Sequence, residues 1–549
     1  MLEIRDRAAV VAPSEPRAAR LFPLLVAPIA AAGLIHALYL AYIVVPSHDE
    51  SSALFFGQLA ASGQISMFED GVVGQRAPGV PYIFGLTQLL AGRDLLAARY
   101  LGVALCGLLV VLTAVLARRL AGPLAGLLAG VLLAGQGSLV AYYAFGDFHA
   151  LVPVMVLVGL LLMFARRTPA RNVLAMAVFA SLFFIRSHVM PMIPLALGYA
   201  LWRARGPVER AALLAVTAGP PLAFLLWDPK HLKLLAHMPV VNALARPLGY
   251  LPFLYLDARP FHGLESQLWR LATLVRRYEF LALLSVVALM AVAWRVRRTG
   301  RAAPYLSNRG VNVVAGLFLA MLAVLLVVFR MNYKWVGMYF ASLGPLLAIV
   351  LGAVWATLLT DEGIGRWLRR AGMALFALGV VLPVYYNRNP SMPIGELRRA
   401  DPVRAVYVAA AHLARVVPAN TRVFFFGPVD VYYLAGLPPT YLPQITNYDT
   451  IAVHDEDNWA TTRSGYYGML QVEYWLGVDA EYAVVSPEAL TTFAVGFHGH
   501  PDVNVPKVER IKTLLARHFE KIDTVREYPL YTYDVYRRVR PGPAVLSPG

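Results

Sequence analysis

Long apolar runs recur along the first two thirds of the chain, separated by short charged or aromatic segments. Most runs are about 17–25 residues long, the length at which an α-helix crosses a ~30 Å hydrocarbon core. Polar residues interrupt the pattern at Gln136, at Asp147 and at Arg186-Ser187-His188. The pattern predicts about eleven membrane spans, at 21–45, 95–117, 120–137, 148–166, 172–187, 189–203, 211–227, 279–295, 311–330, 335–358 and 371–386. The fold class is therefore a polytopic α-helical membrane protein.

Basic residues lie mainly in the connections on one side of these spans. They include Arg118-Arg119, Arg166-Arg167, Arg203, Arg295 to Arg301 and Arg366 to Arg370, all on the same side as the N-terminus. Because cytoplasmic loops are enriched in Lys and Arg, we predict a cytoplasmic N-terminus. An odd number of spans then places the C-terminal region on the extracytoplasmic side of the membrane. The Ala-, Arg- and Val-rich usage indicates a bacterial protein, and hence the inner (plasma) membrane.

Composition agrees with this class. Hydrophobic residues make up 58% of the 549, charged residues only 15%, and the mean hydropathy is +0.57. The net charge of +16 does not indicate a nucleic-acid partner, because the basic residues are scattered between apolar runs. With Cys106 as the single cysteine, neither an intrachain disulfide nor a cysteine-based zinc site can form.

Two long outer loops and a C-terminal region break the series of spans. The loop 46–94 contains amphipathic segments, Ser52 to Leu59 and Tyr82 to Leu90, typical of helices in the membrane interface. The loop 228–278 is rich in aromatic and basic residues, which indicates either an aromatic belt or a mobile flap over a substrate.

Residues 388–549 contain no run long enough to span. Strands are predicted at 421–426, 480–486 and 528–538, and helices at 398–417 and 508–520. We therefore expect two domains: a transmembrane domain, 1–387, and a C-terminal α/β extracytoplasmic domain, 388–549.

Polar residues gather where the spans meet the outer side. They are Asp49, Glu50, Arg76, Asp147, His149, Arg186, His188, Asp228, Lys230, Arg330, Tyr333 and Lys334. Ionisable groups at a membrane edge are costly and often functional. The alternative is that each basic residue snorkels to anchor a helix end, and that Asp49 is a solvated helix N-cap.

These residue types suit sugar transfer from a polyprenyl phosphate. Such transfer needs a carboxylate to accept the proton of an acceptor hydroxyl, a role for Asp49, with Glu50 positioning it or the sugar. It also needs cations for the phosphate, and the candidates are Arg76, Arg186, Arg330 and Lys334. We assign Tyr82, Asp147, His149, His188 and Tyr333 to substrate binding.

Several motifs in this order resemble the integral-membrane glycosyltransferases of the GT-C fold, in the branch of the protein O-mannosyltransferases and the lipid A aminoarabinose transferase. The resemblance covers roughly residues 21–386. It rests on Asp49-Glu50 after the first span, then Arg76, Pro78, Pro81 and Tyr82. Arg99-Tyr100-Leu101, Asp147, and the segment from Arg330 to Leu347 with its Leu-Gly-Pro-Leu-Leu sequence follow.

The resemblance implies that Asp49 is the catalytic base and that Arg76 binds the donor phosphate. It also implies a difference, because the aminoarabinose transferase branch has Glu-Lys-Pro-Pro, with a metal-binding Glu, where this chain has Gln75, Arg76, Ala77 and Pro78. Asp147 and His149 are two candidate ligands, too few for a metal site, and a helix-end hydrogen-bond role is favoured for them. A divalent metal cofactor is left open.

We therefore predict an inverting glycosyltransferase with a polyprenyl-phosphate sugar as donor and a glycan, lipid or protein as acceptor. It works among membrane lipids and binds no nucleic acid. The alternatives are a transporter or lipid-linked sugar flippase, and a non-catalytic scaffold whose outer domain binds a partner.

Overall fold

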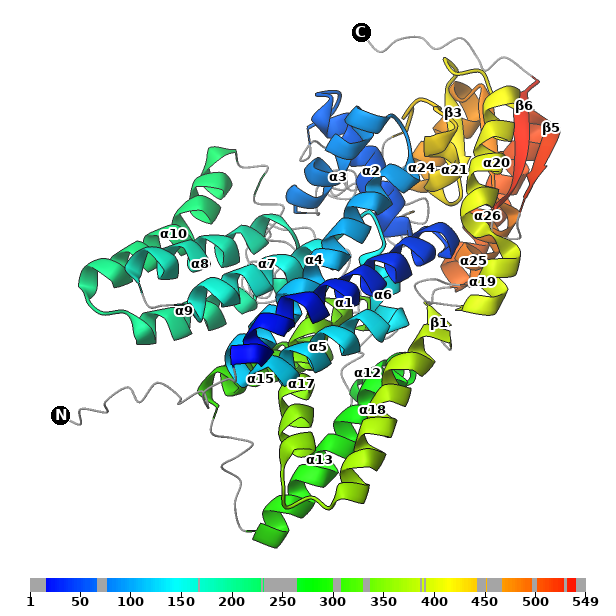
Figure 1. Ribbon diagram of the computed structural model, residues 1–549. Helices are drawn as coiled ribbons and strands as arrows, with labels where there is room; N and C mark the ends of the chain where they lie inside the picture. Colours follow the sequence, from blue (N-terminus) through cyan, green and yellow to red (C-terminus); the bar gives the residue numbers. More distant parts are fainter. Residues whose placement is uncertain are drawn as a thin grey trace. The chain divides into compact units, whose positions relative to one another are not determined.

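The computed structural model is mostly helical, with strands confined to the C-terminal part of the chain (Figure 1). It describes residues 16–66, 77–165, 168–228, 231, 264–299, 308–328, 336–385, 388–389, 392–441, 451, 467–495, 501–527 and 531–539. The chain divides into two compact units. We call Met1–Ala41, Tyr100–Ala223 and Ala258–Glu396 the helical unit, and Tyr42–Arg99, Phe224–Asp257 and Leu397–Gly549 the mixed unit.

The helical unit contains the long apolar helices. They are most of α1 (Pro16–Ile43), most of α4 (Leu95–Ala121), α5 (Pro123–Gly135), α6 (Gly137–Tyr143), α7 (Phe148–Met163), α8 (Pro169–Ser181), α9 (Met192–Arg203), most of α10 (Pro207–Trp227), α12 (Leu264–Arg277), α13 (Glu279–Thr299), α15 (Arg309–Ala323), α16 (Val336–Phe340), α17 (Gly344–Thr360) and α18 (Arg366–Tyr385). A short hairpin of β1 (Arg388–Asn389) and β2 (Met392–Pro393) follows.

Within the described residues, 7 helices are long and apolar enough to cross a membrane, or 8 if the bent pair α5 and α6 counts as one span. This confirms a multi-pass helical membrane protein. Helices α7, α8 and α9 have 16, 13 and 12 residues, so they are shorter than the spans predicted there. The total of about eleven spans stays a prediction.

The break between α5 and α6 occurs where the sequence places a polar residue in an apolar run. The two helices bend by 75° around Gln136, whose Nε2 donates a hydrogen bond to the Gly379 carbonyl in α18 (2.9 Å). A polar group in hydrocarbon must find a partner inside the protein. Gln136 has such a partner, and the predicted interruption at this residue is confirmed.

The mixed unit combines the predicted first outer loop with the C-terminal domain. Its elements are α2 (His48–Ala61), α3 (Gly79–Ala91), most of α19 (Ile394–Ala400), α20 (Pro402–Val416), β3 (Val423–Phe426), α21 (Val429–Leu434), α24 (Met469–Tyr474), β4 (Tyr482–Val485), α25 (Pro487–Val495), α26 (Pro501–His518), β5 (Phe519–Arg526) and β6 (Thr532–Arg538).

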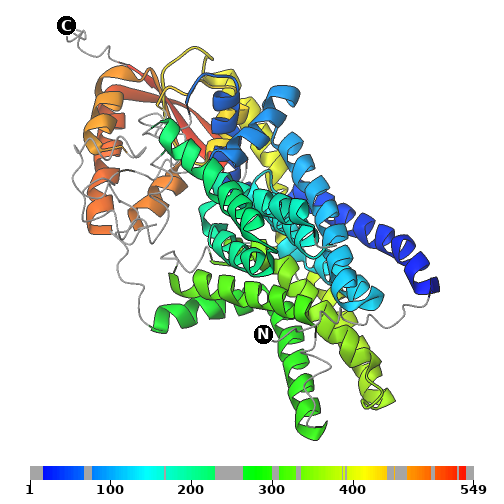
Figure 2. The same ribbon diagram turned by 90° about the vertical axis from the view of Figure 1, so that its left-hand side faces the viewer.

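The four strands form one mixed sheet in the order β3-β4-β6-β5, with β3 and β4 parallel and the other pairs antiparallel. Side chains of successive strand residues point to opposite faces. Phe424 and Phe426 pack in the core with α25 and α26, whereas Phe425 contacts Tyr432 of α21 on the other face. Figure 2 shows the ribbon of this domain, with its last helices and strands in orange and red. The α/β character predicted for the C-terminal region is confirmed. One boundary is wrong, because the helix predicted to reach residue 520 ends at His518 and β5 begins at Phe519.

Helices α2 and α3 cross at two glycines. A Cβ at Gly57 would overlap the Pro81 carbonyl oxygen and lie 2.9 Å from Gly85 Cα, so the two backbones touch directly. Residues 50–57 of α2 are all buried, which differs from the amphipathic helix predicted at Ser52 to Leu59. Packing on α3 and on the C-terminal domain accounts for this difference. Helix α3 does expose apolar side chains, as its prediction required.

We expect Gly57→Ala to lower the free energy of unfolding by about 3 kcal/mol, because the added methyl group has no space beside the α3 backbone. Thermal unfolding of the detergent-solubilised chain measures this. Gly477→Ala is the matched control, since a Cβ at Gly477 meets no atom within 4 Å. Equal stability of the two variants would contradict the close crossing.

Candidate active site

The predicted catalytic loop starts with α2, whose first turn is held by a capping box. The Ser47 Oγ accepts a hydrogen bond from Glu50 N (3.0 Å), and Glu50 Oε2 accepts one from Ser47 N (3.4 Å). This pattern satisfies N–H groups that a helix start leaves open. The N-cap is therefore Ser47, and the alternative interpretation of Asp49 as a solvated N-cap is wrong. Asp49 is a half-buried residue of the first turn.

Glu50 belongs to a fully buried ion pair. Arg99, at the start of α4, donates from Nε to Glu50 Oε1 (2.9 Å) and from Nη2 to Oε2 (2.8 Å), and both side chains are 0% exposed. Arg99 Nη1 also donates to the Val44 carbonyl (2.9 Å), in the segment that leads into α2. A two-bond contact between Arg and a carboxylate fixes orientation as well as distance. The residue beside Asp49 is therefore held in one position.

Arg99 is a site residue that the sequence analysis missed. It appeared there only as the first residue of a family motif. An arginine in the first turns of an apolar helix, preceded by an acidic pair at the end of the previous span, is the pattern that predicts such an ion pair.

A second carboxyl is buried near this pair. Asp430, on α21, is 4% exposed, and its Oδ1 has no hydrogen-bond partner among the described residues. The buried Tyr531 hydroxyl donates to the same carboxyl. Burial raises the pKa of Asp430 to about 6; the Tyr531 hydrogen bond opposes this rise, and the negative charge of Glu50 adds to it.

The raised pKa of Asp430 predicts a pH-dependent stability. The folded chain binds this proton more tightly than the unfolded chain, whose carboxyl has a pKa of 3.8. The contribution is therefore fully present below about pH 4 and is lost as the pH rises through about 6, a difference of about 3 kcal/mol. Thermal unfolding between pH 4 and 8 should show this loss in the wild type but not in Asp430→Asn.

The control for this measurement is Asp523→Asn. Asp523 is a surface carboxylate whose pKa is lowered, mainly by its hydrogen bond to His412, so its substitution should leave the loss in place. A wild type and an Asp430→Asn variant with parallel pH profiles would contradict the prediction.

In the helical unit, Asp147 caps α7. Its Oδ1 accepts a hydrogen bond from His149 N (3.0 Å) and also contacts His149 Nδ1. The helix-end role favoured for Asp147 is therefore present. Both side chains are buried, and Asp147 Oδ2 and His149 Nε2 have no hydrogen-bond partner within the described ranges. Buried polar atoms without partners are costly, and such atoms in a folded protein call for a structural or functional explanation.

Three of the predicted residues lie against the Phe148 ring. His149 stacks on it with centroids 4.1 Å apart, His188 meets it at 5.5 Å, and the Arg186 guanidinium carbon lies 4.3 Å from its centroid. With Asp147, they form what we call the Phe148 cluster. His188 Nε2 is 3.1 Å from Ser342 Oγ, whereas its Nδ1 has no partner in the described part of the chain.

The sequence analysis also missed Arg277, which lies near the Phe148 cluster. It ends α12, and its Nη1 donates to the Tyr142 hydroxyl (2.8 Å); the Tyr142 ring lies 5.1 Å from that of His149. Aromatic faces beside cations and hydrogen-bonding groups suit a sugar phosphate. The rings can cover the sugar, and the arginines can pair with the phosphate.

The Phe148 cluster only partly fits a divalent metal ion. Asp147 Oδ2 and His149 Nε2 are chemically suitable ligand atoms, and no residue in the described ranges hydrogen-bonds either of them. Among the residues that the structure describes, however, no group of three His, Cys, Asp or Glu side chains is arranged to hold a metal. We therefore derive no chemical step through a metal.

Of the remaining predicted site residues, the structure describes only Tyr82. Arg76, Arg330, Tyr333 and Lys334 lie outside the described residues. Tyr82 lies in the first turn of α3 and is 41% exposed.

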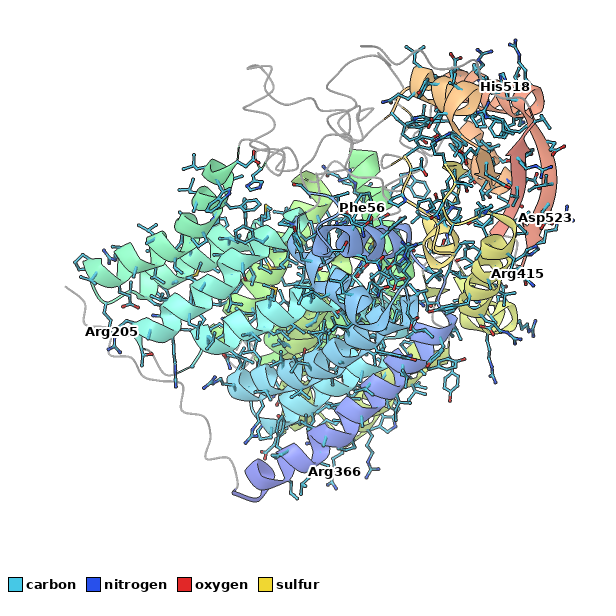
Figure 3. The ribbon with its side chains drawn as sticks, turned by 90° about the horizontal axis from the view of Figure 1, so that it is seen from above. Phe56, Arg205, Arg366, Arg415, His518 and Asp523 are labelled. Carbon is cyan, nitrogen blue, oxygen red and sulfur yellow. The ribbon has the colours of Figure 1, made fainter. Side chains whose placement is uncertain are left out.

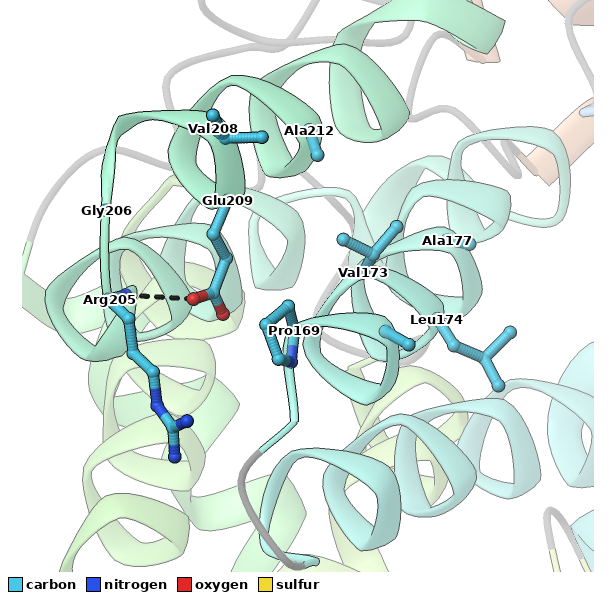
Figure 4. A pocket seen from close by; sticks show the side chains of 10 residues that line it. Pro169, Val173, Leu174, Ala177, Arg205, Gly206, Val208, Glu209 and Ala212 are labelled. Carbon is cyan, nitrogen blue, oxygen red and sulfur yellow. Dashed lines mark hydrogen bonds between the residues drawn. The ribbon is translucent and has the colours of Figure 1, made fainter.

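A cavity of about 730 Å³ lies between α8 and α10 (Figure 4). Its lining is mostly apolar, and Glu209 within it accepts hydrogen bonds from Arg205 N (2.8 Å) and Asn172 Nδ2 (2.6 Å). Arg205, labelled in Figure 3, lies in the connection between α9 and α10. Because Leu174 and Val208 expose apolar surface beside this cavity, it suits lipid rather than sugar chemistry.

Comparison with solved structures decides the fold. The crystal structure of ArnT from Cupriavidus metallidurans bound to undecaprenyl phosphate aligns with a TM-score of 0.56 and 14% identity, over 95% of this chain and 99% of that chain. The chain has the GT-C fold. The apo structure of the same ArnT aligns with a TM-score of 0.53 and 14% identity, over 96% and 100%.

An oligosaccharyltransferase from Archaeoglobus fulgidus also aligns with this GT-C chain, with a TM-score of 0.48 and 12% identity, over 87% of this chain and 72% of that chain. No protein-family model and no curated protein matches the sequence. The two ArnT alignments confirm the fold that the motif order implies.

Proposed function

We propose that this GT-C chain is an inverting glycosyltransferase that moves a sugar from a polyprenyl-phosphate donor to an acceptor hydroxyl at the outer face of the membrane. The observation that carries the proposal is the placement of Asp49. It lies on a capped helix start, beside a glutamate held by Arg99 in a buried ion pair. The undecaprenyl phosphate bound to the similar ArnT supports a lipid phosphate as the leaving group.

The proposed reaction is a single displacement. The acceptor oxygen attacks the anomeric carbon while an Asp49 carboxylate oxygen takes its proton, and the bond from that carbon to the phosphate oxygen breaks. Polyprenyl phosphate leaves with the bonding electrons, and the configuration at the anomeric carbon inverts. Glu50 positions Asp49 and does not itself take the proton, because Arg99 occupies both of its oxygens.

Cations must neutralise the charge that develops on the phosphate. We assign this role to Arg186 and, outside the described residues, to Arg76, Arg330 and Lys334. Asp147, His149 and His188 would hydrogen-bond the sugar or the acceptor through the side-chain atoms that have no partner among the described residues. Tyr82 and Tyr333 complete the proposed substrate contacts.

The proposed location is the bacterial inner membrane, with the N-terminus in the cytoplasm and the C-terminal domain outside. The donor then approaches within the bilayer, and the acceptor, a glycan, lipid or protein, approaches from the outer side. A hexose or a pentose would both suit the described groups.

The test is release of the carrier lipid. The purified chain in proteoliposomes is incubated with undecaprenyl phosphate carrying a labelled sugar, together with a mixture of cell-envelope glycans, lipids and proteins. We expect free undecaprenyl phosphate and labelled acceptor in equal amounts. A flippase would move the donor between leaflets without releasing the phosphate, and a scaffold would do neither, so either result would refute the proposal.

A further inference from the structure

The helix that carries Asp49 is packed against the C-terminal domain within the mixed unit. The Phe55 ring of α2 lies 4.9 Å from that of Tyr433 and 6.5 Å from that of Tyr432, both on α21. All three side chains are buried. Two turns of helix separate Phe55 from Asp49, so this contact fixes the same rigid element that presents the carboxylate.

Hydrogen bonds tie Gln88 of α3 and Arg93, which follows α3, to α21 and the residues after it. The Tyr433 hydroxyl donates to Gln88 Oε1 of α3 (3.0 Å), in a buried contact. Arg93 lies over the rings of Phe55 and Tyr433, at 5.8 and 5.5 Å, and donates to the carbonyls of Tyr433 (3.4 Å) and Leu437 (3.3 Å).

A further link joins the start of α4 to α20. The Tyr407 hydroxyl donates to Asp94 Oδ1 and accepts a hydrogen bond from Leu96 N (3.1 Å). Arg99 lies one turn further along the same helix, so the ion-pair partner of Glu50 is fixed by a C-terminal residue as well.

We propose that the C-terminal domain positions the catalytic base, and that Tyr433 is the positioning residue through which it acts. We call Phe55, Gln88, Arg93 and Tyr433 the α2–α21 interface. In this account the domain sets the rate of transfer by holding α2, rather than only choosing the acceptor. The inference rests on the proposed function, because it assigns Asp49 the role of base.

Asp430 extends the interface toward Glu50. It lies three residues before Tyr433 on α21, buried, within electrostatic range of the Glu50 carboxylate. Asp430 is hydrogen-bonded to Tyr531, and the charge of Arg99 in turn acts on Tyr531.

The experiment compares three variants of the full chain in proteoliposomes. Tyr433→Phe removes only the hydroxyl that bonds Gln88, and Tyr433→Ala also removes the ring that packs on Phe55. The matched control is Tyr441→Phe, which removes a hydroxyl that donates to Asp479 Oδ2 (2.7 Å) inside the C-terminal domain. Each variant is assayed for kcat, for KM of donor and acceptor, and for thermal stability.

We expect kcat to fall about tenfold in Tyr433→Phe and about a hundredfold in Tyr433→Ala, because a small displacement of the base slows the reaction. Both KM values should stay within about twofold of the wild type, and Tyr441→Phe should keep its kcat. A raised acceptor KM with unchanged kcat would assign the domain to acceptor choice and overturn the proposal. An equal loss of kcat in Tyr441→Phe would overturn it as well.

Amide hydrogen exchange in α2 tests the positioning role of Tyr433 independently of the proposed function. The amides of α2 should exchange at least about tenfold faster in the Tyr433 variants than in the wild type or in Tyr441→Phe. This readout requires no donor or acceptor. A wild type that releases no polyprenyl phosphate would refute the function alone, whereas unchanged exchange in α2 would refute the positioning role alone.

Discussion

Asp49→Asn is expected to lower sugar transfer by about 10²–10⁴-fold, because an amide cannot take the proton of the acceptor hydroxyl. The capping box belongs to Ser47 and Glu50, so α2 should still form. Expression, thermal stability and donor binding should therefore remain close to those of the wild type. Release of free undecaprenyl phosphate measures the transfer, and co-purified or titrated lipid measures the binding.

The control for Asp49→Asn is the same chemical change at another helix start. Asp401 is the N-cap of α20, where its side chain accepts a hydrogen bond from Arg404 N. Asp401→Asn exchanges a carboxylate for an amide there and should keep full activity. Wild-type turnover by Asp49→Asn would remove Asp49 from the role of base.

Arg99→Met is expected to destabilise the chain by about 3–5 kcal/mol, because it leaves the Glu50 carboxylate buried without its partner. Glu50→Gln should cost a similar amount by leaving the guanidinium unpaired. The double variant should cost less than the sum of the two, since it removes both charges together. Thermal unfolding in detergent and the yield of folded protein measure these differences.

The matched control is a more exposed ion pair of the same geometry. Arg295 donates to Asp361 through Nε (2.6 Å) and Nη2 (2.9 Å), and the two side chains are 17% and 18% exposed. Water compensates part of the lost interaction there, so Arg295→Met should cost about 1 kcal/mol. Equal costs at the two sites would show that burial of the Glu50–Arg99 pair is not what makes it strong.

The helical architecture could be predicted because every segment that crosses the hydrocarbon must be a long apolar helix. The span predicted at 279–295 is helix α13, which continues to Thr299, and the span at 371–386 is α18, which begins earlier, at Arg366. The differences lie at arginine-rich ends. An arginine can extend a helix beyond the hydrocarbon and keep its charge in water, so hydropathy alone underestimates such helices.

The C-terminal domain was harder to predict in detail. Strands β3 and β4 appear as short apolar runs, and both were expected. Strand β5 was not, because its residues alternate weakly between buried and exposed positions and follow α26 without a turn. Helix α21 has 6 residues, too few for a helical period to be recognised.

The site could be predicted only where its residues adjoin in sequence. Asp49 and Glu50 stand out because they directly follow a span, and Asp147 and His149 because they open one. Arg99 and Asp430 come near Glu50 only through tertiary packing. Nothing local to Asp430, in a short run of Val and Tyr residues, distinguishes it from a surface carboxylate.

Gln88 and Tyr433, which are hydrogen-bonded, are separated by 345 residues in the sequence, so this bond can form only late in synthesis of the chain. At about 5–20 residues per second, a ribosome needs roughly 20–70 s to synthesise the intervening polypeptide. During that interval the nascent segment with Asp49 is already made but lacks the aromatic support of Tyr433. Translation therefore has to pass Tyr433 before this segment is supported, and a product truncated ahead of that residue would insert into the bilayer yet stay inactive.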